Sequence, residues 1–246
     1  MLELMPTEQK WSWNACGKHP VAKDFIRLGR RFPLSISMEE WVDKGYQAVT
    51  CTLKTGRQPQ FWRFWTRGNV NDELICGVLR DSSDSIGREY PLLVVGAGTI
   101  SSWEEQWDLL PGACEGAWNR IEYLCTRNPL DLAGMGQELL KIRPPEPDWQ
   151  DYRTTWEAGI KALQDSPTLE RMDARLKRVR EEQELRMELD NGVSDQLILV
   201  SHILSRIKAA GKGSPNTVFI GGTFDVACLV MYWRPLVVGD FIELWK

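Results

Sequence analysis

The stretch from Asp84 to Leu93 holds the side chains of this sequence that are best suited to do chemistry. It carries a carboxylate at Asp84 and a guanidinium at Arg88, and serines stand beside them at 82, 83 and 85. A carboxylate, a fixed fork of guanidinium donors and nearby hydroxyls are what a hydrolase or a phosphate-handling enzyme would use. An enzyme of that kind is therefore one hypothesis for the function of this chain.

The rest of the sequence speaks against an enzyme, because a serine nucleophile needs a base within hydrogen-bond reach. The only histidines are His19 and His202, neither lies in a recognisable nucleophile context, and no Gly-x-Ser-x-Gly elbow occurs. We therefore assign no catalytic residue. The structural interpretation is that Asp84 and Arg88 form a charge-assisted pair that fixes the loop, with Asp24 as a third member, and that the fixed loop binds a partner.

Other motifs that could hold a cofactor or a metal are incomplete. Gly96-Ala97-Gly98 lacks the third glycine of a dinucleotide-binding loop, so we interpret it as a loop after a strand. Gly211-Lys212-Gly213-Ser214 follows a helix and is interpreted as its stop signal. The six cysteines show neither a Cys-x-x-Cys pair nor a histidine at metal spacing. We expect scattered core thiols, no metal site and no cofactor.

The elements around the Asp84 loop alternate between one helix and several short strands. Ser37-Met38-Glu39-Glu40 is a capping box, which predicts a helix from there to about residue 49 with one apolar face. Turn residues then separate short apolar segments typical of antiparallel strands. The predicted strands are Cys51–Leu53, Phe61–Thr66, Leu74–Leu79 and Tyr90–Val95.

The second half of the sequence is mainly helical. A capping box at Ser102–Glu105 predicts the start of a helical region, and Pro144–Pro147 must end it. Residues 148–210 read as helical, with a heavily charged part at 168–189 and a more apolar helix at Asp195–Ala210. Strand character returns at the C-terminus, at Thr217–Ile220, Val226–Met231 and Leu236–Val238.

This order of elements predicts an α+β fold with a mostly antiparallel central sheet flanked by helices. Two isolated C-terminal strands cannot form a stable sheet, so they are expected to join the N-terminal one. The prediction is one domain over residues 1–246, made of a motif-bearing part (15–143), a helical segment (148–210) and the C-terminal strands (215–246). A split into two domains at Pro144–Pro147 is the alternative.

Composition limits the partners. The 246 residues are 43% hydrophobic with a formal net charge of −4, which gives no electrostatic footprint for nucleic acid or an anionic membrane. No apolar run is long enough to span a bilayer, and Met1–Lys10 lacks the features of a signal peptide. We expect a cytoplasmic protein without membrane insertion. Twelve tryptophans are expected mainly in the core, although some could anchor a partner.

The sequence contains three short motifs: Gly17-Lys18-x-Pro20 with Asp24-Phe25, then Trp62-Arg63-Phe64, then Asp84-x-x-Gly87-Arg88-x-x-Pro91. Their order and spacing resemble the TagF (ImpM) family of type VI secretion accessory proteins. Lys23 departs from this pattern, because the family usually has a glycine there. The residues that carry the resemblance, and that we take as motif or partner-binding residues, are Gly17, Lys18, Pro20, Asp24, Phe25, Trp62, Arg63, Phe64, Asp84, Gly87, Arg88 and Pro91.

The resemblance implies a non-enzymatic, post-translational negative regulator of type VI secretion. Its partner would be the cytoplasmic forkhead-associated scaffold protein of the apparatus, and it would act outside the threonine-phosphorylation route. The matched residues could equally form the skeleton of the fold. The alternatives are a hydrolase or phosphate-handling enzyme that uses Asp84 and Arg88, or a structural subunit held by the charged helix at 168–189.

Overall fold

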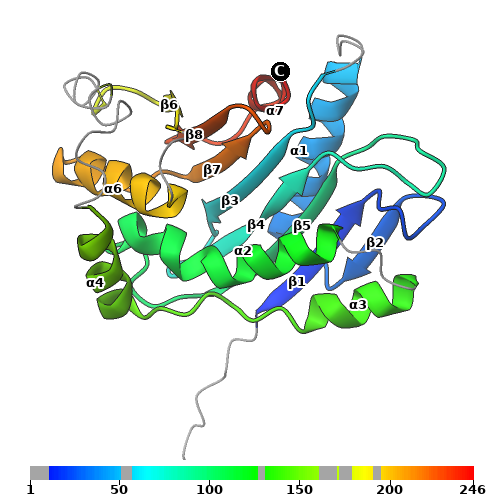
Figure 1. Ribbon diagram of the computed structural model, residues 1–246, viewed down its shortest axis with the longest axis horizontal. Helices are drawn as coiled ribbons and strands as arrows, with labels where there is room; N and C mark the ends of the chain where they lie inside the picture. Colours follow the sequence, from blue (N-terminus) through cyan, green and yellow to red (C-terminus); the bar gives the residue numbers. More distant parts are fainter. Residues whose placement is uncertain (1–10, 51–56, 127–130, 161–170, 172–178, 191–194) are drawn as a thin grey trace, which may run out of the picture.

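The computed structural model describes residues 11–50, 57–126, 131–160, 171, 179–190 and 195–246. Within them one sheet of eight strands runs through the molecule in the order β2-β1-β5-β4-β3-β7-β8-β6 (Figure 1). All neighbouring strands are antiparallel. The strands are β1 (Ser12–Gly17), β2 (Ile26–Gly29), β3 (Phe61–Arg67), β4 (Glu73–Arg80), β5 (Leu92–Thr99), β6 (Glu184–Glu188), β7 (Thr217–Gly222) and β8 (Ala227–Tyr232).

Helices cover both faces of the sheet. One face packs against α2, α3 and α6, and the other packs against α1 and α7. Figure 1 shows the long α2 lying across the sheet and α4 at the side of α6. The helices are α1 (Pro33–Thr50), the 3₁₀ turn η1 (Trp107–Leu109), α2 (Leu110–Thr126), α3 (Leu132–Leu140), α4 (Trp149–Ile160), α6 (Gln196–Ala209) and α7 (Val238–Leu244).

The strands are apolar at successive positions because each face of the sheet has its own core. In β4, Leu74, Cys76 and Val78 face α2, whereas Ile75 and Leu79 face α1 and α7. This follows from the period of two in a strand, which sends neighbouring side chains to opposite faces. The predicted α+β fold with an antiparallel sheet flanked by helices is confirmed.

The C-terminal strands β7 and β8 belong to the same sheet as the N-terminal strands, between β3 and the edge strand β6. β7 pairs with β3, with Phe64 opposite Phe219, and β8 then pairs with β7. Together they continue the sheet from β3 towards β6. One sheet thus joins parts of the chain that lie on either side of Pro144–Pro147.

The predicted start of the first helix at Ser37 is wrong, since α1 begins at Pro33. Proline suits the first turn of a helix because its fixed φ is helical and its missing N–H would have no partner there. Ser35 Oγ accepts a hydrogen bond from the Phe32 amide at 3.0 Å, which helps to cap this end. Ser37 lies inside the helix, where its Oγ donates to the Pro33 carbonyl at 3.2 Å.

The prediction of helix through residues 168–189 is wrong at its C-terminal end, where residues 184–188 form β6. Leu185 and Met187 are buried, whereas Arg186 between them and the flanking Glu184 and Glu188 are exposed. This alternation has the period of a strand, but it spans only five residues and is rich in residues that favour helices. Most of the predicted charged helix, and the predicted strand Cys51–Leu53, lie outside the described residues.

Three further predictions need correction. Ser102 does not cap a helix: its φ is 59°, its amide donates to Asp72 Oδ1 at 3.2 Å, and α2 begins only at Leu110. Leu236–Val238 is not a strand but the approach to α7, where Asp240 accepts from the Val237 amide at 2.8 Å. The segment 96–98 is not a loop, because it belongs to β5.

The glycines of β5 serve packing. A Cβ at Gly96 would overlap the ring of Trp13, and a Cβ at Gly98 would overlap the ring of Trp11. Glycine within a strand is typical where another group approaches the backbone closely. Trp13 lies in β1 and Trp11 directly precedes this strand, which, like β2, was not predicted from the sequence.

Candidate functional site

Two of the three sequence motifs meet at one end of the sheet. Gly17, the last residue of β1, pairs with Leu92, the first residue of β5. Gly17 has φ of 124°, and a Cβ there would overlap the carbonyl oxygen of Pro91. Glycine is required by both the backbone angle and this close approach. The connection that follows β1 (residues 18–25) therefore lies against the connection between β4 and β5 (residues 81–91), and we call these two connections the motif loops.

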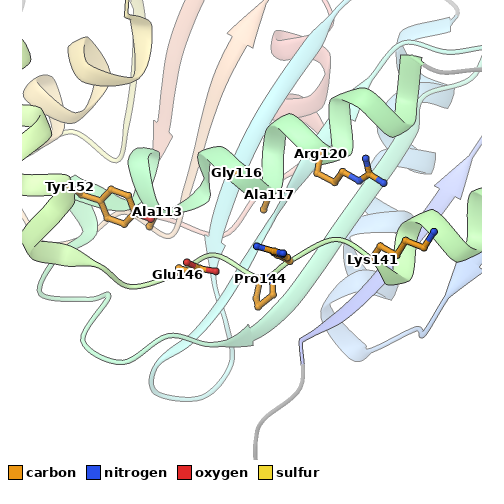
Figure 2. Close-up of a pocket in the computed structure, with 9 residues that line it drawn as sticks. Ala113, Gly116, Ala117, Arg120, Lys141, Pro144, Glu146 and Tyr152 are labelled. Atoms are coloured by element: carbon orange, nitrogen blue, oxygen red, sulfur yellow. The ribbon is translucent and has the colours of Figure 1, made fainter.

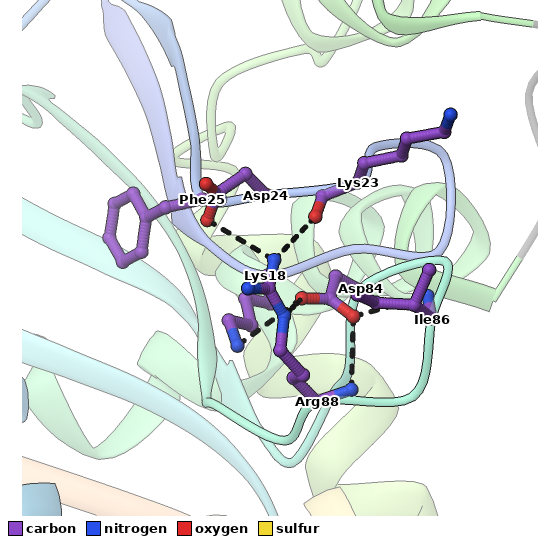
Figure 3. A network of polar contacts seen from close by, with 7 residues as sticks. All are labelled: Lys18, Lys23, Asp24, Phe25, Asp84, Ile86 and Arg88. Atoms are coloured by element: carbon purple, nitrogen blue, oxygen red, sulfur yellow. Dashed lines mark hydrogen bonds and ion pairs between the residues drawn. The ribbon is translucent and has the colours of Figure 1, made fainter.

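Asp84 is the centre of the motif loops (Figure 3). Its side chain is fully buried. Oδ1 accepts from the amides of Ile86 at 3.1 Å and Arg88 at 2.9 Å, and Oδ2 accepts from Arg88 Nε at 2.7 Å. Lys18 Nζ lies 3.3 Å from Oδ2. Burial alone would raise the pKa of this carboxyl, but the hydrogen bonds from Arg88, Lys18 and Ile86 outweigh it and lower the pKa well below its ordinary value.

Arg88 connects the two motif loops. Its Nη2 donates to the carbonyl of Lys23 at 2.6 Å and lies 3.6 Å from Asp24 Oδ1, as Figure 3 shows. The Ser85 amide donates to the Ala22 carbonyl at 2.9 Å, which adds a second connection. About half of the Arg88 side chain remains exposed, at 51%. The guanidinium is thus held by the fold and still accessible to a partner.

The glycine positions of the motif loops differ in what they require. Gly87 has φ of 84° and an open surface around it, so its backbone angle alone favours glycine. Among the described residues, positive φ outside glycine occurs only at Asp72 and Ser102. Lys23 therefore has an ordinary backbone angle, and this turn is built without the glycine of the family pattern.

The remaining residues of the first motif lie at the rim of the site. Pro20 is exposed at the turn. The Phe25 amide donates to Asp24 Oδ1 at 2.8 Å, and the Phe25 ring lies 5.3 Å from Tyr90 and 4.6 Å from the Arg27 guanidinium. These contacts fix the position where the loop returns to β2.

The aromatic motif of β3 does not join this cluster. Trp62 and Phe64 are fully buried against the face that packs on α1 and α7. Arg63 points to the other face, where it pairs with Glu122 and donates to Asn119 of α2 at 3.0 Å. These three residues hold helices on the sheet, and the structure does not bring them to the motif loops.

Two residues at the base of the motif loops were missed from the sequence. His19 is 1% exposed, accepts from the Val21 amide at 3.1 Å, and has its pKa lowered chiefly by burial. Asp81 accepts from Arg57 at 2.5 and 2.6 Å, from the Gln60 amide at 2.7 Å and from Trp245 Nε1 at 3.0 Å. Asp81 thus connects the loop base to the C-terminus, a contact over 164 positions that no local pattern indicates.

The geometry of the motif loops does not favour catalysis. Asp84 is ionised and surrounded by donors, so it offers neither a proton nor a free lone pair for a base. Among the described residues, no hydrogen bond joins Ser82, Ser83 or Ser85 to an imidazole, and no three His, Cys, Asp or Glu side chains are placed to hold a metal. What remains is a rigid, partly charged surface.

A hollow of about 410 Å³ lies elsewhere, between α2 and the segment after α3 (Figure 2). Arg120 and Lys141, two of its cations, both pair with Glu138. None of the sequence-predicted site residues lines it. The full lining is Ala113, Gly116, Ala117, Arg120, Lys141, Arg143, Pro144, Glu146 and Tyr152.

A family model of the TagF N-terminal domain, described as type VI secretion system-associated, matches residues 14–141. This is more than half of the chain and contains every residue of the three motifs. The chain belongs to the TagF family. The TagF match ends before β6, β7 and β8, which complete the sheet, and before α7, which packs on one of its faces.

The fold has a counterpart among solved structures. The crystal structure of PA0076 from Pseudomonas aeruginosa PAO1 superposes with a TM-score of 0.54 at 17% sequence identity, covering 95% of this chain and 93% of that chain. No curated protein matches the sequence. In the part of the chain that the structure describes, none of the helices has the length and apolar character to cross a bilayer.

Proposed function

We propose that this TagF protein is a non-enzymatic regulator that restrains type VI secretion in the cytoplasm by binding the forkhead-associated scaffold protein of the apparatus. Membership of the TagF family places the chain among type VI secretion accessory proteins. The negative direction of the regulation and the identity of the scaffold rest on the family resemblance.

The observation that carries a binding role is the state of Asp84. A buried carboxylate with four donors fixes the loop from Ser85 to Glu89, whose residues are all exposed. A surface that is already ordered before binding loses little conformational entropy when a partner docks. Acid–base catalysis by Asp84 would instead need an unpaired carboxylate oxygen or a pKa near neutrality.

Ile86 gives the most direct access to this surface. Its side chain is 64% exposed, whereas its amide serves Asp84 and does not depend on the side chain. An aspartate at this position would place a charge in the interface without removing a donor from the cluster. Val70 offers a matched control, since it is 63% exposed in the β3–β4 turn, at the opposite end of the sheet.

The test is titration of the purified scaffold with wild type, Ile86→Asp and Val70→Asp, after circular dichroism shows that all three are folded. We expect Ile86→Asp to weaken binding by roughly tenfold or more, as for a buried interface position, and Val70→Asp to bind as wild type does. Equal affinity of all three proteins would remove the motif loops from the interface. No binding by wild type would exclude the scaffold as the partner.

A further inference from the structure

Four connections lie at the same end of the sheet. Gly17 pairs with Leu92, Arg80 pairs with both Leu92 and Phe61, and Phe61 pairs with Gly222. The motif loops, the approach to β3 (residues 57–60) and the tip of the β7–β8 hairpin (residues 223–226) therefore all lie at this end of the sheet. With strands about 4.8 Å apart, this end extends roughly 20 Å from β1 to β7. A standard protein–protein interface buries about 800 Å² on each partner, which corresponds to a patch roughly 28 Å across, so the two widths are similar.

Several apolar side chains are exposed at this end of the sheet. Phe224 at the hairpin tip is 96% exposed, and Val226 beside it is 42% exposed. Ile86 of the motif loops is 64% exposed. A single exposed apolar residue needs no explanation, but an aromatic ring with almost no contact in its own molecule is what an interface anchor looks like before its partner arrives.

The hairpin tip that carries Phe224 is held in one conformation. The Thr223 amide donates to the Val226 carbonyl, and the Val226 amide donates to Thr223 Oγ1, each at 3.1 Å. Gly222 has φ of 137°, and a Cβ there would overlap the Val226 carbonyl oxygen. Asp225 accepts a hydrogen bond from Gln58, which connects the tip to the approach to β3. The ring is thus presented by an ordered turn, and little entropy is lost when it is bound.

Most charged side chains at this end of the sheet form ion pairs or hydrogen bonds within the protein. Arg88 contacts Asp84 and Asp24, Arg57 contacts Asp81, and Asp225 contacts Gln58. Lys23 and Glu89 of the motif loops are exposed and make no ion pair with the described residues, whereas Phe224 is the most exposed large apolar side chain at this end of the sheet. A partner that fits this end therefore offers a hydrophobic pocket for an aromatic ring, with polar or charged groups around it.

We propose that Phe224 is an aromatic anchor that inserts into a hydrophobic pocket of the protein bound by the motif loops, which extends the binding surface beyond the segment matched by the TagF model. This proposal rests on the proposed function, since it assigns a second contact to the same partner. It predicts that a residue outside positions 14–141 controls affinity for the scaffold.

The experiment is titration of the purified scaffold with wild type, Phe224→Asp, Phe224→Tyr and Val70→Asp. Phe224 makes no packing contact that a substitution would break, so all variants should keep the wild-type unfolding temperature. We expect Phe224→Asp to lower affinity by roughly thirtyfold or more, as for an anchor residue, and Phe224→Tyr to stay within a few-fold of wild type.

The outcomes separate the two proposals. Loss of binding with Ile86→Asp but not with Phe224→Asp would overturn the anchor and leave the proposed function standing. Failure of wild type to bind would remove both. Two controls test other occupants of Phe224: sedimentation with anionic phospholipid vesicles, and light scattering after size exclusion. Vesicle binding or a dimer that is abolished by Phe224→Asp would overturn the proposal by showing that a membrane or a second copy takes the ring.

Discussion

At the residue scale, the candidate site depends on one buried carboxylate. Asp84 draws donors from Lys18 in one connection and from Arg88 in another, so segments far apart in the sequence become one unit. Charge-assisted bonds of this kind are stronger than neutral ones and hold a geometry more tightly. We therefore expect a substitution of Asp84 to disrupt the structure of both motif loops, whereas substitutions of residues at the rim should leave the loop structure intact.

The pH dependence of stability tests this role. Because the pKa of Asp84 is lowered in the folded protein, its ionised form contributes its full stabilisation above the unfolded value of about 4. This contribution is lost progressively as pH falls from that value toward the lowered pKa of the folded protein. We expect Asp84→Asn to lower the free energy of unfolding at pH 7, and the gap to wild type to narrow between pH 4 and pH 3. Urea unfolding at both ends of this range measures it.

Asp24→Asn is the comparison variant, because the Asp24 side chain is 81% exposed and its pair with Arg88 is correspondingly weak. It should remain close to wild type at every pH. A gap between Asp84→Asn and wild type that stays constant down to pH 3 would contradict the assigned state of Asp84.

Residue types and spacing could predict the pair of Asp84 and Arg88, because its members lie four positions apart across a turn with a glycine. The contribution of Lys18 to the same carboxylate depends on the pairing of β1 with β5, which the sequence did not predict. The same holds for Asp81 and Trp245, which meet only after the C-terminal helix has packed. The pair of Arg88 with Asp24 was also predicted, although these residues lie in different connections. The contacts of Lys18 and Trp245 could not be predicted, because they depend on how distant segments pair and pack.

At the element scale, the helices are set on the sheet by close approaches. Gly45 of α1 faces α7, and a Cβ at this position would overlap the ring of Phe241. Gly116 of α2 is exposed, with open space where its Cβ would stand. The two glycines have the same local setting within a helix but opposite tertiary surroundings.

We therefore expect substitutions with alanine to have opposite effects. Gly116→Ala should stabilise the protein by about 0.5–1 kcal/mol, because alanine has the higher helix propensity. Gly45→Ala should destabilise it by about 1–3 kcal/mol, because overpacking forces α1 away from α7. Thermal and urea unfolding of the two variants measure this. Stabilisation by both would show that α1 and α7 are not in close contact.

Two secondary-structure elements, β6 and the start of α1, could not be predicted correctly from local sequence patterns. Leu185 and Met187 give β6 a strand period over only five residues, and the long helical charge pattern before it concealed that signal. The capping-box pattern Ser37–Glu40 lies inside α1, after the start of the helix at Pro33, so this pattern predicts the wrong first residue. At both places the sequence carries more than one local pattern, and tertiary packing determines which of these patterns the structure follows.

At the scale of the whole molecule, the TagF-matched segment is not a self-contained sheet. Residues 14–141 hold β1 to β5, and without β7 the edge of β3 would be left unpaired. An unpaired, apolar edge is an aggregation hazard, so the C-terminal strands complete the fold as well as supply the hairpin with Phe224. This gives a physical reason for one sheet that spans both ends of the chain.

The most direct test of the motif loops as the binding surface is hydrogen–deuterium exchange of the wild-type protein with and without the purified scaffold. We predict slowed exchange on binding in residues 18–25, 81–91 and 222–227, with no change in the β3–β4 turn around Val70 at the opposite end of the sheet. Protection confined to other surfaces, such as the hollow between α2 and the segment after α3, would contradict the claim that the motif loops form the binding surface.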